Sequence, residues 1–157
     1  MKIAVCISGQ SRTWERCVPS IKKFIECDPS FDVHYFGHTW TQNSWKVNAK
    51  QRTFSYEFET LHKDNLFKRL QFAYNFESLI IEHPLVFDKN VQEIKKFCKT
   101  GPELASNSIY PNVWNSMSYI AMMSNFQKQQ YENKHDMKFD IVLKIRLDQC
   151  FHPAFSF

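Results

Sequence analysis

The chain has 157 residues, of which 43% are hydrophobic and 16% aromatic, so it is long enough for one domain with a real core and too apolar to be disordered. Its 20 Lys and Arg residues are scattered and give a net charge of only +4, which argues against a basic stripe for binding nucleic acid. No apolar run has the length of a signal-peptide core or a membrane span, so we expect one soluble, cytoplasmic domain over residues 1–157.

The start of the chain predicts a β-α-β unit. Residues 2–8 (KIAVCIS) and 31–37 (FDVHYFG) are short apolar runs with β-branched or aromatic members, and each is closed by a glycine. Residues 11–27 between them have apolar side chains spaced three and four apart, which predicts a helix. Pro19 must then lie in the first turns of this helix, or the helix begins late.

The rest of the chain continues this alternation. In order, the patterns predict a polar loop over 38–54, a helix over 56–75, a strand over 78–83 closed by Pro84, and a weak helix over 90–98. They then predict a loop over 101–111, a helix over 112–135 capped by Asn112, and a strand over 139–145. The four strands are expected to begin near Lys2, Asp32, Ser78 and Asp140. This order predicts an α/β fold with a mainly parallel, doubly wound sheet and helices on both faces.

A polar stretch, SGQSR, follows the first predicted strand. It offers backbone N–H groups, two hydroxyls, an amide and a guanidinium at a helix start, which suits an anion or a base edge. The residues are Ser8, Gly9, Gln10, Ser11 and Arg12. The alternative is an ordinary strand-to-helix turn in which Ser11 caps the helix and Arg12 is solvated. The stretch does not match the Gly-rich phosphate-binding patterns of P-loop or dinucleotide-binding proteins.

The histidines, the cysteines and the stretch at 119–123 have mainly structural interpretations. His38, in GHTW after the second predicted strand, adds a polar group at the same sheet edge, although a lone histidine is more often structural. The histidines lack metal-ligand spacing, so a zinc hydrolase is not indicated. The five cysteines form an odd set without C-x-x-C spacing, and the stretch YIAMM at 119–123 is typical of a core, so we expect both to serve packing.

Arg146 and Asp148 stand two residues apart where the last predicted strand ends. Side chains two residues apart on a strand share one face, so this pair would emerge side by side. The alternative is an exposed ion pair at a strand end, worth less than about 1 kcal/mol.

The stretches ISGQSRTW, DVHYFGHTW, IIEHP and FDIVLKIRLDQCF, with a long helix before the last, resemble a family of glycosyltransferase-like proteins with the GT-A fold, found in bacterial surface-polysaccharide loci and in viruses. The resemblance covers nearly the whole chain. It implies the strand order three, two, one, four, which brings SGQSR and RLD together at the point where α/β sheets bind ligands. It also implies that the first loop holds the nucleotide of a sugar-nucleotide donor, and that RLD takes the place of the Asp-x-Asp motif that binds metal and diphosphate.

Two departures from the family change what the resemblance implies. Arg146 replaces the usual first aspartate, so the two-carboxylate metal site is missing. Arg146 would then pair with the diphosphate, and Asp148 would hold a ribose hydroxyl or a single Mn²⁺ or Mg²⁺ ion, which leaves the need for metal open. Because the chain ends at Phe157, we also expect the acceptor-binding part of the family to be missing.

Three functions stay open on this basis. The first is a glycosyltransferase, or its donor-binding half, that moves a sugar from a nucleotide diphosphate to a saccharide or other hydroxyl acceptor, in the host cytoplasm for a viral protein. Its expected residues are Arg146 and Asp148 for catalysis, Asp148 for any metal, and Ser8, Gly9, Gln10, Arg12 and His38 for the donor. The second is a non-catalytic module that binds a nucleotide or nucleotide-sugar, and the third is an α/β interaction domain whose aromatic residues over 38–45 contact a partner.

Overall fold

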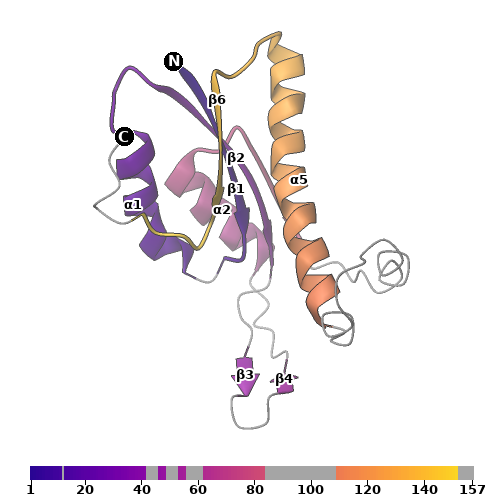
Figure 1. Cartoon of the computed structure of the whole chain (residues 1–157). Coiled ribbons are helices and arrows are strands. Elements are labelled where there is room, and N and C mark those ends of the chain that lie inside the picture. The colour runs from indigo at the N-terminus through magenta and orange to yellow at the C-terminus, as the bar shows by residue number, and fades with distance from the viewer. Residues whose placement is uncertain (12, 42–45, 49–52, 56–61, 84–108, 152–157) are drawn as a thin grey trace.

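The computed structural model describes residues 1–11, 13–41, 46–48, 53–55, 62–83 and 109–151. Within these residues the main sheet has four parallel strands, β1 (Lys2–Gly9), β2 (Asp32–Trp40), β5 (Ser78–Glu82) and β6 (Ile141–Arg146). Their order in the sheet is β5-β2-β1-β6 (Figure 1). This is the order three, two, one, four, so the predicted parallel α/β sheet is confirmed and the fold is Rossmann-like.

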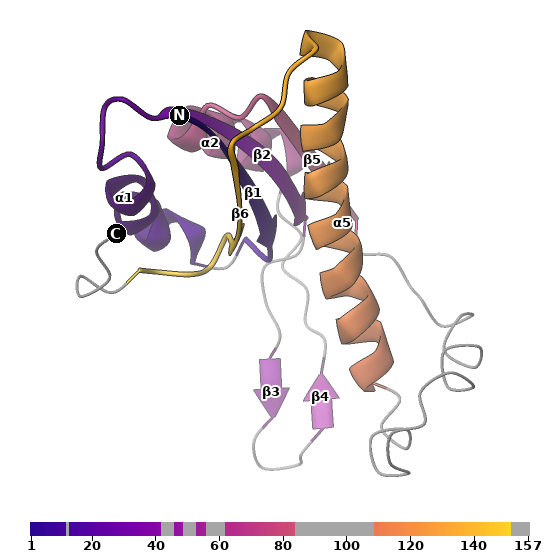
Figure 2. The ribbon, with the colours of Figure 1, turned by 45° about the horizontal axis from the view of Figure 1, so that its top comes forward.

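Helices cover both faces of the sheet. Helices α1 (Trp14–Ile25) and α2 (Lys63–Tyr74) lie on one side, and the long helix α5 (Ile109–His135) lies on the other (Figures 1 and 2). The two views agree on this three-layer arrangement. A strand at the centre of such a sheet has no face in water, and a continuous apolar run is what it requires.

The central strand β1 divides its side chains between the two layers. Successive residues of a strand point to opposite faces, so alternate members of the run pack in different cores. Ile3, Val5 and Ile7 pack with buried residues of α1 and α2, whereas Ala4 and Cys6 pack on the other side, where Tyr131 of α5 lies. One short apolar run therefore contributes to both hydrophobic cores.

The first two helices form as their apolar spacing predicts. Trp14, Cys17, Ile21 and Ile25 are the buried residues of α1. Thr13 is the N-cap residue of α1 and makes no side-chain capping hydrogen bond, so the alternative in which Ser11 is the cap residue is wrong. Helix α1 therefore begins late, and its proline lies in the second turn.

Helix α2 is shorter than the predicted helix over 56–75, of which 56–61 lie outside the described residues. It buries Leu66, Leu70 and Tyr74 and ends at Asn75, whose left-handed backbone (φ 53°) closes the last turn.

Strand β2 is longer than the sequence predicts. It continues through Gly37 to Trp40, so His38 belongs to the strand and does not follow it. A Cβ at Gly37 would lie 2.7 Å from both Leu79 Cδ1 and Phe76 Cε1. This glycine therefore allows two apolar side chains to pack against the backbone, and it does not mark a turn.

The predicted loop over 38–54 is wrong in a second respect. It contains the strands β3 (Lys46–Asn48) and β4 (Thr53–Ser55), which pair in an antiparallel ladder. This small second sheet lies beyond the carboxyl ends of the main sheet (Figures 1 and 2).

Helix α5 begins at Ile109, three residues before the predicted cap Asn112. Within the stretch 119–123, Ile120 is buried but Met122 is 58% exposed, so the prediction that this stretch belongs to the core is confirmed only in part. The buried residues of α5 include Ile120 but also Ser124, Gln127, Lys128 and Glu132.

The predicted helix over 90–98 lies outside the described residues, as do residues 101–108 of the predicted loop over 101–111. The last part of that prediction is wrong, because residues 109–111 belong to α5. No helix in the described part of the chain combines the length and the apolar composition needed to cross a membrane.

Candidate functional site at the carboxyl edge of the sheet

The carboxyl ends of the three neighbouring strands β2, β1 and β6 bring most of the predicted site residues together. Ser8 pairs with His38 of β2 on one side and with Arg146 of β6 on the other. Just beyond the end of β6, the N–H of Leu147 donates to the carbonyl oxygen of Ser8 at 2.9 Å. The two polar stretches SGQSR and RLD, which are far apart in the sequence, are therefore neighbours in space.

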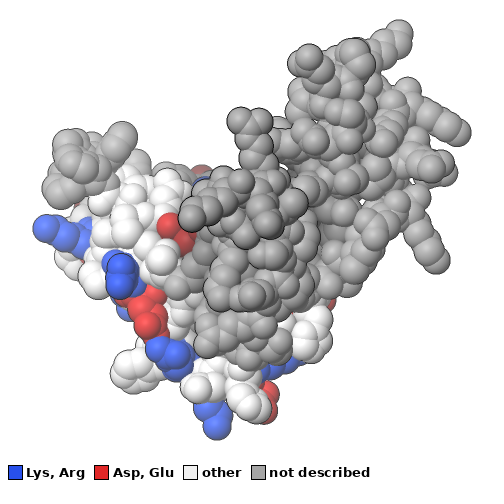
Figure 3. Space-filling view, turned by 90° about the horizontal axis from the view of Figure 1, so that it is seen from below, with Lys and Arg blue, Asp and Glu red and all other residues white. Residues whose placement is uncertain are grey.

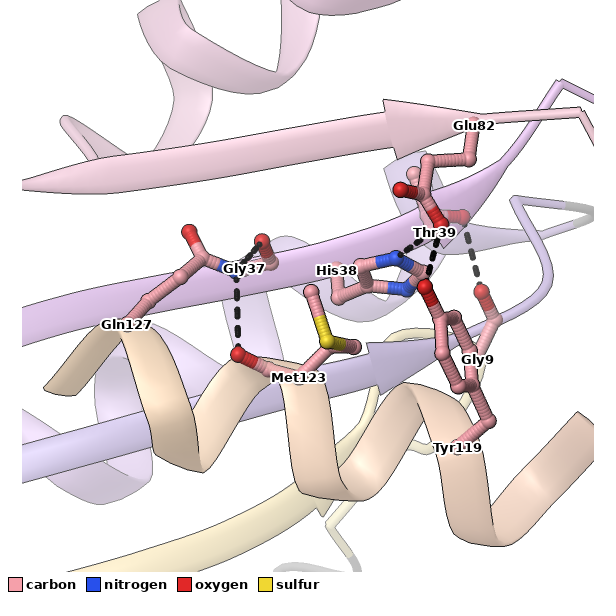
Figure 4. Close-up of polar contacts among 8 residues, drawn as sticks. All are labelled: Gly9, Gly37, His38, Thr39, Glu82, Tyr119, Met123 and Gln127. Atoms are coloured by element: carbon pink, nitrogen blue, oxygen red, sulfur yellow. Dashed lines mark hydrogen bonds and ion pairs between the residues drawn. The ribbon is translucent and has the colours of Figure 1, made fainter. Parts of the chain in front are cut away.

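Gly9, at the end of β1, lies against the residues that follow β6. Its φ of +135° lies where other residues are strained, and an added Cβ would lie 3.4 Å from the backbone nitrogen of Leu147 and 3.8 Å from Oδ1 of Asp148. Its carbonyl oxygen accepts a hydrogen bond of 2.7 Å from the Thr39 hydroxyl of the adjacent strand (Figure 4). The end of β1 is thus fixed by both neighbouring strands, and the absent side chain leaves room beside the Asp148 carboxylate.

Arg146 and Asp148 form a two-pronged ion pair. Nε of Arg146 donates to Oδ1 of Asp148 at 2.9 Å, and Nη2 donates to Oδ2 at 3.0 Å. Strand β6 ends at Arg146, so a turn, and not the strand face predicted from the sequence, brings the pair together. The hydrogen bonds to Asp148 raise the pKa of Arg146, which is charged in any case.

Burial within this pair is unequal, and this decides what each residue can do. The Asp148 side chain is 9% exposed, whereas that of Arg146 is 47% exposed. A guanidinium has five N–H groups, and the pair uses only two of them. Asp148 therefore orients Arg146, and Arg146 presents its remaining donors toward solvent at the sheet edge.

Two other predicted site residues follow Gly9. Gln10 has a buried side-chain oxygen, Oε1, with no hydrogen-bond partner among the described residues. Buried acceptors are rarely left unpaired in native proteins, so this oxygen is a candidate for bonding a ligand donor. Arg12 lies outside the described residues. On the described part of the face seen from below, toward the carboxyl ends of the strands, basic and acidic side chains lie side by side (Figure 3).

His38 is the centre of a buried polar cluster. Its side chain is fully buried, and its Nε2 lies 3.0 Å from Oε2 of Glu82 at the end of β5. The hydroxyl of Tyr119 from α5 donates to the same carboxylate oxygen at 3.2 Å (Figure 4). Trp40 stacks on Tyr119, with ring centroids 5.8 Å apart. The Nδ1 atom of His38 is buried with no partner among the described residues, which makes it a second unpaired group near this edge.

The sequence interpretation placed Trp40 at this edge with His38 but missed two members of the cluster, Glu82 and Tyr119. Glu82 carried a usable signal, because it is a carboxylate at the end of an otherwise apolar strand, SLIIE. Tyr119 carried none, since it lies in the stretch YIAMM, which is typical of a core.

The buried position of His38 predicts a pH dependence of stability. Burial lowers its pKa, although the hydrogen bond and charge of Glu82 act in the opposite direction. Below the unfolded value of about 6.5, the unfolded chain therefore binds more protons at this residue than the folded chain does. The free energy of unfolding should fall as the pH drops below about 6.5, and His38→Gln should reduce this fall. Urea denaturation at a series of pH values measures it.

The control for this experiment is His62→Gln. His62 is exposed and makes no side-chain capping bond at the start of α2, so its replacement should leave the pH dependence unchanged. An equal pH dependence in the His38 variant and the unmutated chain would contradict the assignment.

The described residues do not form a metal site. No group of three or more His, Cys, Asp or Glu side chains among them is placed to hold a metal ion. Both oxygens of Asp148 already accept hydrogen bonds from Arg146, so a cation at Asp148 would have to displace a guanidinium. The residues present therefore do not fit the single-ion site that the sequence left open.

The described surface also has an open depression of about 790 Å³ between α1 and α2. None of the predicted site residues lines it. Its lining residues are Trp14, Glu15, Val18, Pro19, Lys68, Arg69, Phe72 and Ala73.

Comparison of the chain with models of protein families, with curated proteins and with solved structures finds no match. The resemblance to GT-A glycosyltransferase-like proteins therefore stays a prediction from the quoted stretches, and the case for a function depends on the geometry at the carboxyl edge.

Proposed function

We propose that this domain binds a nucleoside diphosphate, as part of a nucleotide-sugar, at the carboxyl edge of its sheet, and that it is the donor-binding part of a glycosyltransferase. The observation that carries the proposal is the position of the Arg146–Asp148 pair directly beside Gly9, where β1 and β6 end. In α/β sheets, ligands bind beyond the carboxyl ends of the strands at the point where the strand order reverses. β1 lies at that point in this sheet.

The chemistry of the edge suits an anion with a polar base attached. A half-exposed guanidinium, held in one orientation by a buried carboxylate, can donate two parallel hydrogen bonds to phosphate oxygens. Gln10 adds a buried oxygen that can accept from a base or a ribose hydroxyl. In a transfer reaction, Arg146 would stabilise the negative charge that develops on the departing diphosphate.

The same arrangement favours binding without a divalent ion. Arg146 places positive charge where members of the resembled family have a carboxylate and use a metal. Because Asp148 is engaged by Arg146, we assign it to positioning the guanidinium, and we derive no step through a metal.

A second candidate, a non-catalytic module that binds a nucleotide or nucleotide-sugar, is favoured by one observation. Both oxygens of Asp148, the carboxylate beside Gly9, accept hydrogen bonds from Arg146, so this carboxylate is engaged in positioning the guanidinium and not in activating an acceptor hydroxyl. This candidate shares the binding site of the first and differs only in the absence of transfer.

Calorimetric titration of the full chain with nucleoside diphosphates and nucleotide-sugars tests the proposal. We expect at least one nucleoside diphosphate to bind in the presence of a chelator, and added Mn²⁺ or Mg²⁺ to change the affinity little. If a nucleotide-sugar binds but is neither hydrolysed nor transferred to any saccharide offered, the non-catalytic module is favoured. If the folded chain binds no nucleotide with or without metal, the proposal is wrong and an interaction domain becomes the better interpretation.

A further inference from the structure

Two cysteines that are distant in the sequence face each other close to the candidate site. The Sγ atoms of Cys17 and Cys150 are 3.1 Å apart, across a sequence separation of 133 residues. This distance is only about 1 Å longer than a disulfide bond of ~2.05 Å. Cys17 is buried in α1, and Cys150 is exposed two residues after Asp148. The buried partner and the exposed partner thus meet where the chain leaves β6.

Other contacts hold the segment after β6 against the helix that carries Cys17. The ring of Phe151 stacks on that of Phe24, with centroids 4.3 Å apart and planes 7° from parallel. The backbone N–H of Phe151 donates to the Ser20 hydroxyl at 3.3 Å. Cys150 itself lies outside any helix or strand, so a shift of about 1 Å toward Cys17 does not require a regular element to move. The proximity of the sulfurs is therefore part of a packed arrangement.

We propose that Cys17 and Cys150 form a reversible disulfide that ties the segment following Asp148 to α1. The proposal does not depend on the proposed function, because it concerns only thiols and their packing. The disulfide would fix the position of the chain just after Asp148, the residue whose carboxylate lies beside Gly9. The oxidant is a small-molecule disulfide, for which oxidised glutathione serves as the probe.

The reaction proceeds by two thiol–disulfide exchanges. The exposed Cys150 thiolate attacks one sulfur of oxidised glutathione, releases one glutathione thiolate and leaves a mixed disulfide. Cys17 then attacks the Cys150 sulfur and expels the second glutathione, whose departing thiolate takes up the proton that Cys17 loses. Two protein thiols are thereby oxidised and one molecule of oxidised glutathione is reduced to two thiols. Burial, followed by the contact with Cys150, raises the pKa of Cys17 to about 11, so the second exchange is the slower one at neutral pH.

The test uses the full chain, reduced and then incubated with oxidised glutathione. The remaining thiols are blocked with iodoacetamide, and peptides are identified by mass spectrometry without reduction. We expect a peptide pair joined through Cys17 and Cys150. Because the bond closes a long loop, oxidation should also raise the Tm by about 5–10 °C, and dithiothreitol should reverse the change.

Two matched variants make the result decisive. Cys150→Ser changes an exposed residue and should abolish both the joined peptide and the rise in Tm. Cys27→Ser changes another exposed free cysteine and should leave both intact. Stable glutathione on Cys150 without loss of the second glutathione, or joined peptides that exclude Cys17, would overturn the proposal.

Discussion

Replacing Glu132 by leucine is expected to lower the free energy of unfolding by about 3–5 kcal/mol, the cost of breaking a buried ion pair by removing one partner. The Nζ of Lys128 donates to Oε2 of Glu132 at 2.8 Å, and the two side chains are only 10% and 4% exposed. The N–H of Phe139 donates to the other carboxylate oxygen at 3.3 Å. Leucine would leave a buried ammonium and a buried N–H without this acceptor. Denaturation by urea at neutral pH measures the loss.

The charge of Glu132 in the folded chain supports the expected loss of stability. Burial raises the pKa of Glu132, but hydrogen bonds from Lys128, the Phe139 N–H and Lys138 lower it by more, so the net shift is downward. The carboxylate is therefore ionised at neutral pH. Its contribution to stability is present above the unfolded pKa of about 4.5 and is lost as the pH falls through the lower folded value.

Two comparisons separate the buried pair from ordinary effects of substitution. Glu15→Leu removes a glutamate from an exposed ion pair with Arg69, in which both side chains are 53% exposed, and it should cost less than about 1 kcal/mol. Adding Lys128→Met to Glu132→Leu should recover much of the stability, because no unpaired charge then stays buried. A loss from Glu132→Leu no larger than that from Glu15→Leu would show that the pair is not effectively buried.

Replacing Arg146 by alanine is expected to weaken nucleoside diphosphate binding by about 1.5–3 kcal/mol, the range for a hydrogen bond to a charged group. This corresponds to a dissociation constant about 10–150 times higher. The reason is the loss of a guanidinium that Asp148 holds in place at 2.9 and 3.0 Å beside the end of β1. Calorimetry in the presence of a chelator measures the change directly.

Lys144→Ala is the matched control for this variant. It removes the same charge from an exposed side chain of the same strand, two residues earlier, and should change the affinity by less than a factor of about three. Equal weakening by the two variants would mean that β6 attracts the ligand only through general charge. Unchanged binding by the arginine variant would place the nucleotide elsewhere on the domain.

The local pattern of the sequence was sufficient to predict the sheet. Each of the four main strands begins within one residue of its predicted start, because each is marked by a short apolar run with β-branched or aromatic members. The prediction that SGQSR and RLD lie side by side came from the resemblance, through the strand order that it implies. Given that order, polar stretches that end adjacent parallel strands must meet at one edge.

Contacts between distant residues decided what the sequence could not. The sequence suggested that a strand ends at Gly37. In the structure β2 continues through this glycine, and Phe76 and Leu79 pack where its side chain would lie. The sequence also did not reveal which polar residues are buried. A local pattern distinguishes apolar from polar positions, and it cannot distinguish a polar side chain in water from one buried by a partner elsewhere in the fold.

The same limit applies to individual pairs of residues. Glu82 and Tyr119 meet His38 only because β5, β2 and α5 are adjacent, and Cys17 meets Cys150 across 133 residues. The sequence by itself determined the layers of this domain and the direction of its strands, because these follow from the periodicity of burial. The tertiary structure alone decided which polar side chains and thiols became partners, because such pairing depends on distances between elements that no local period encodes.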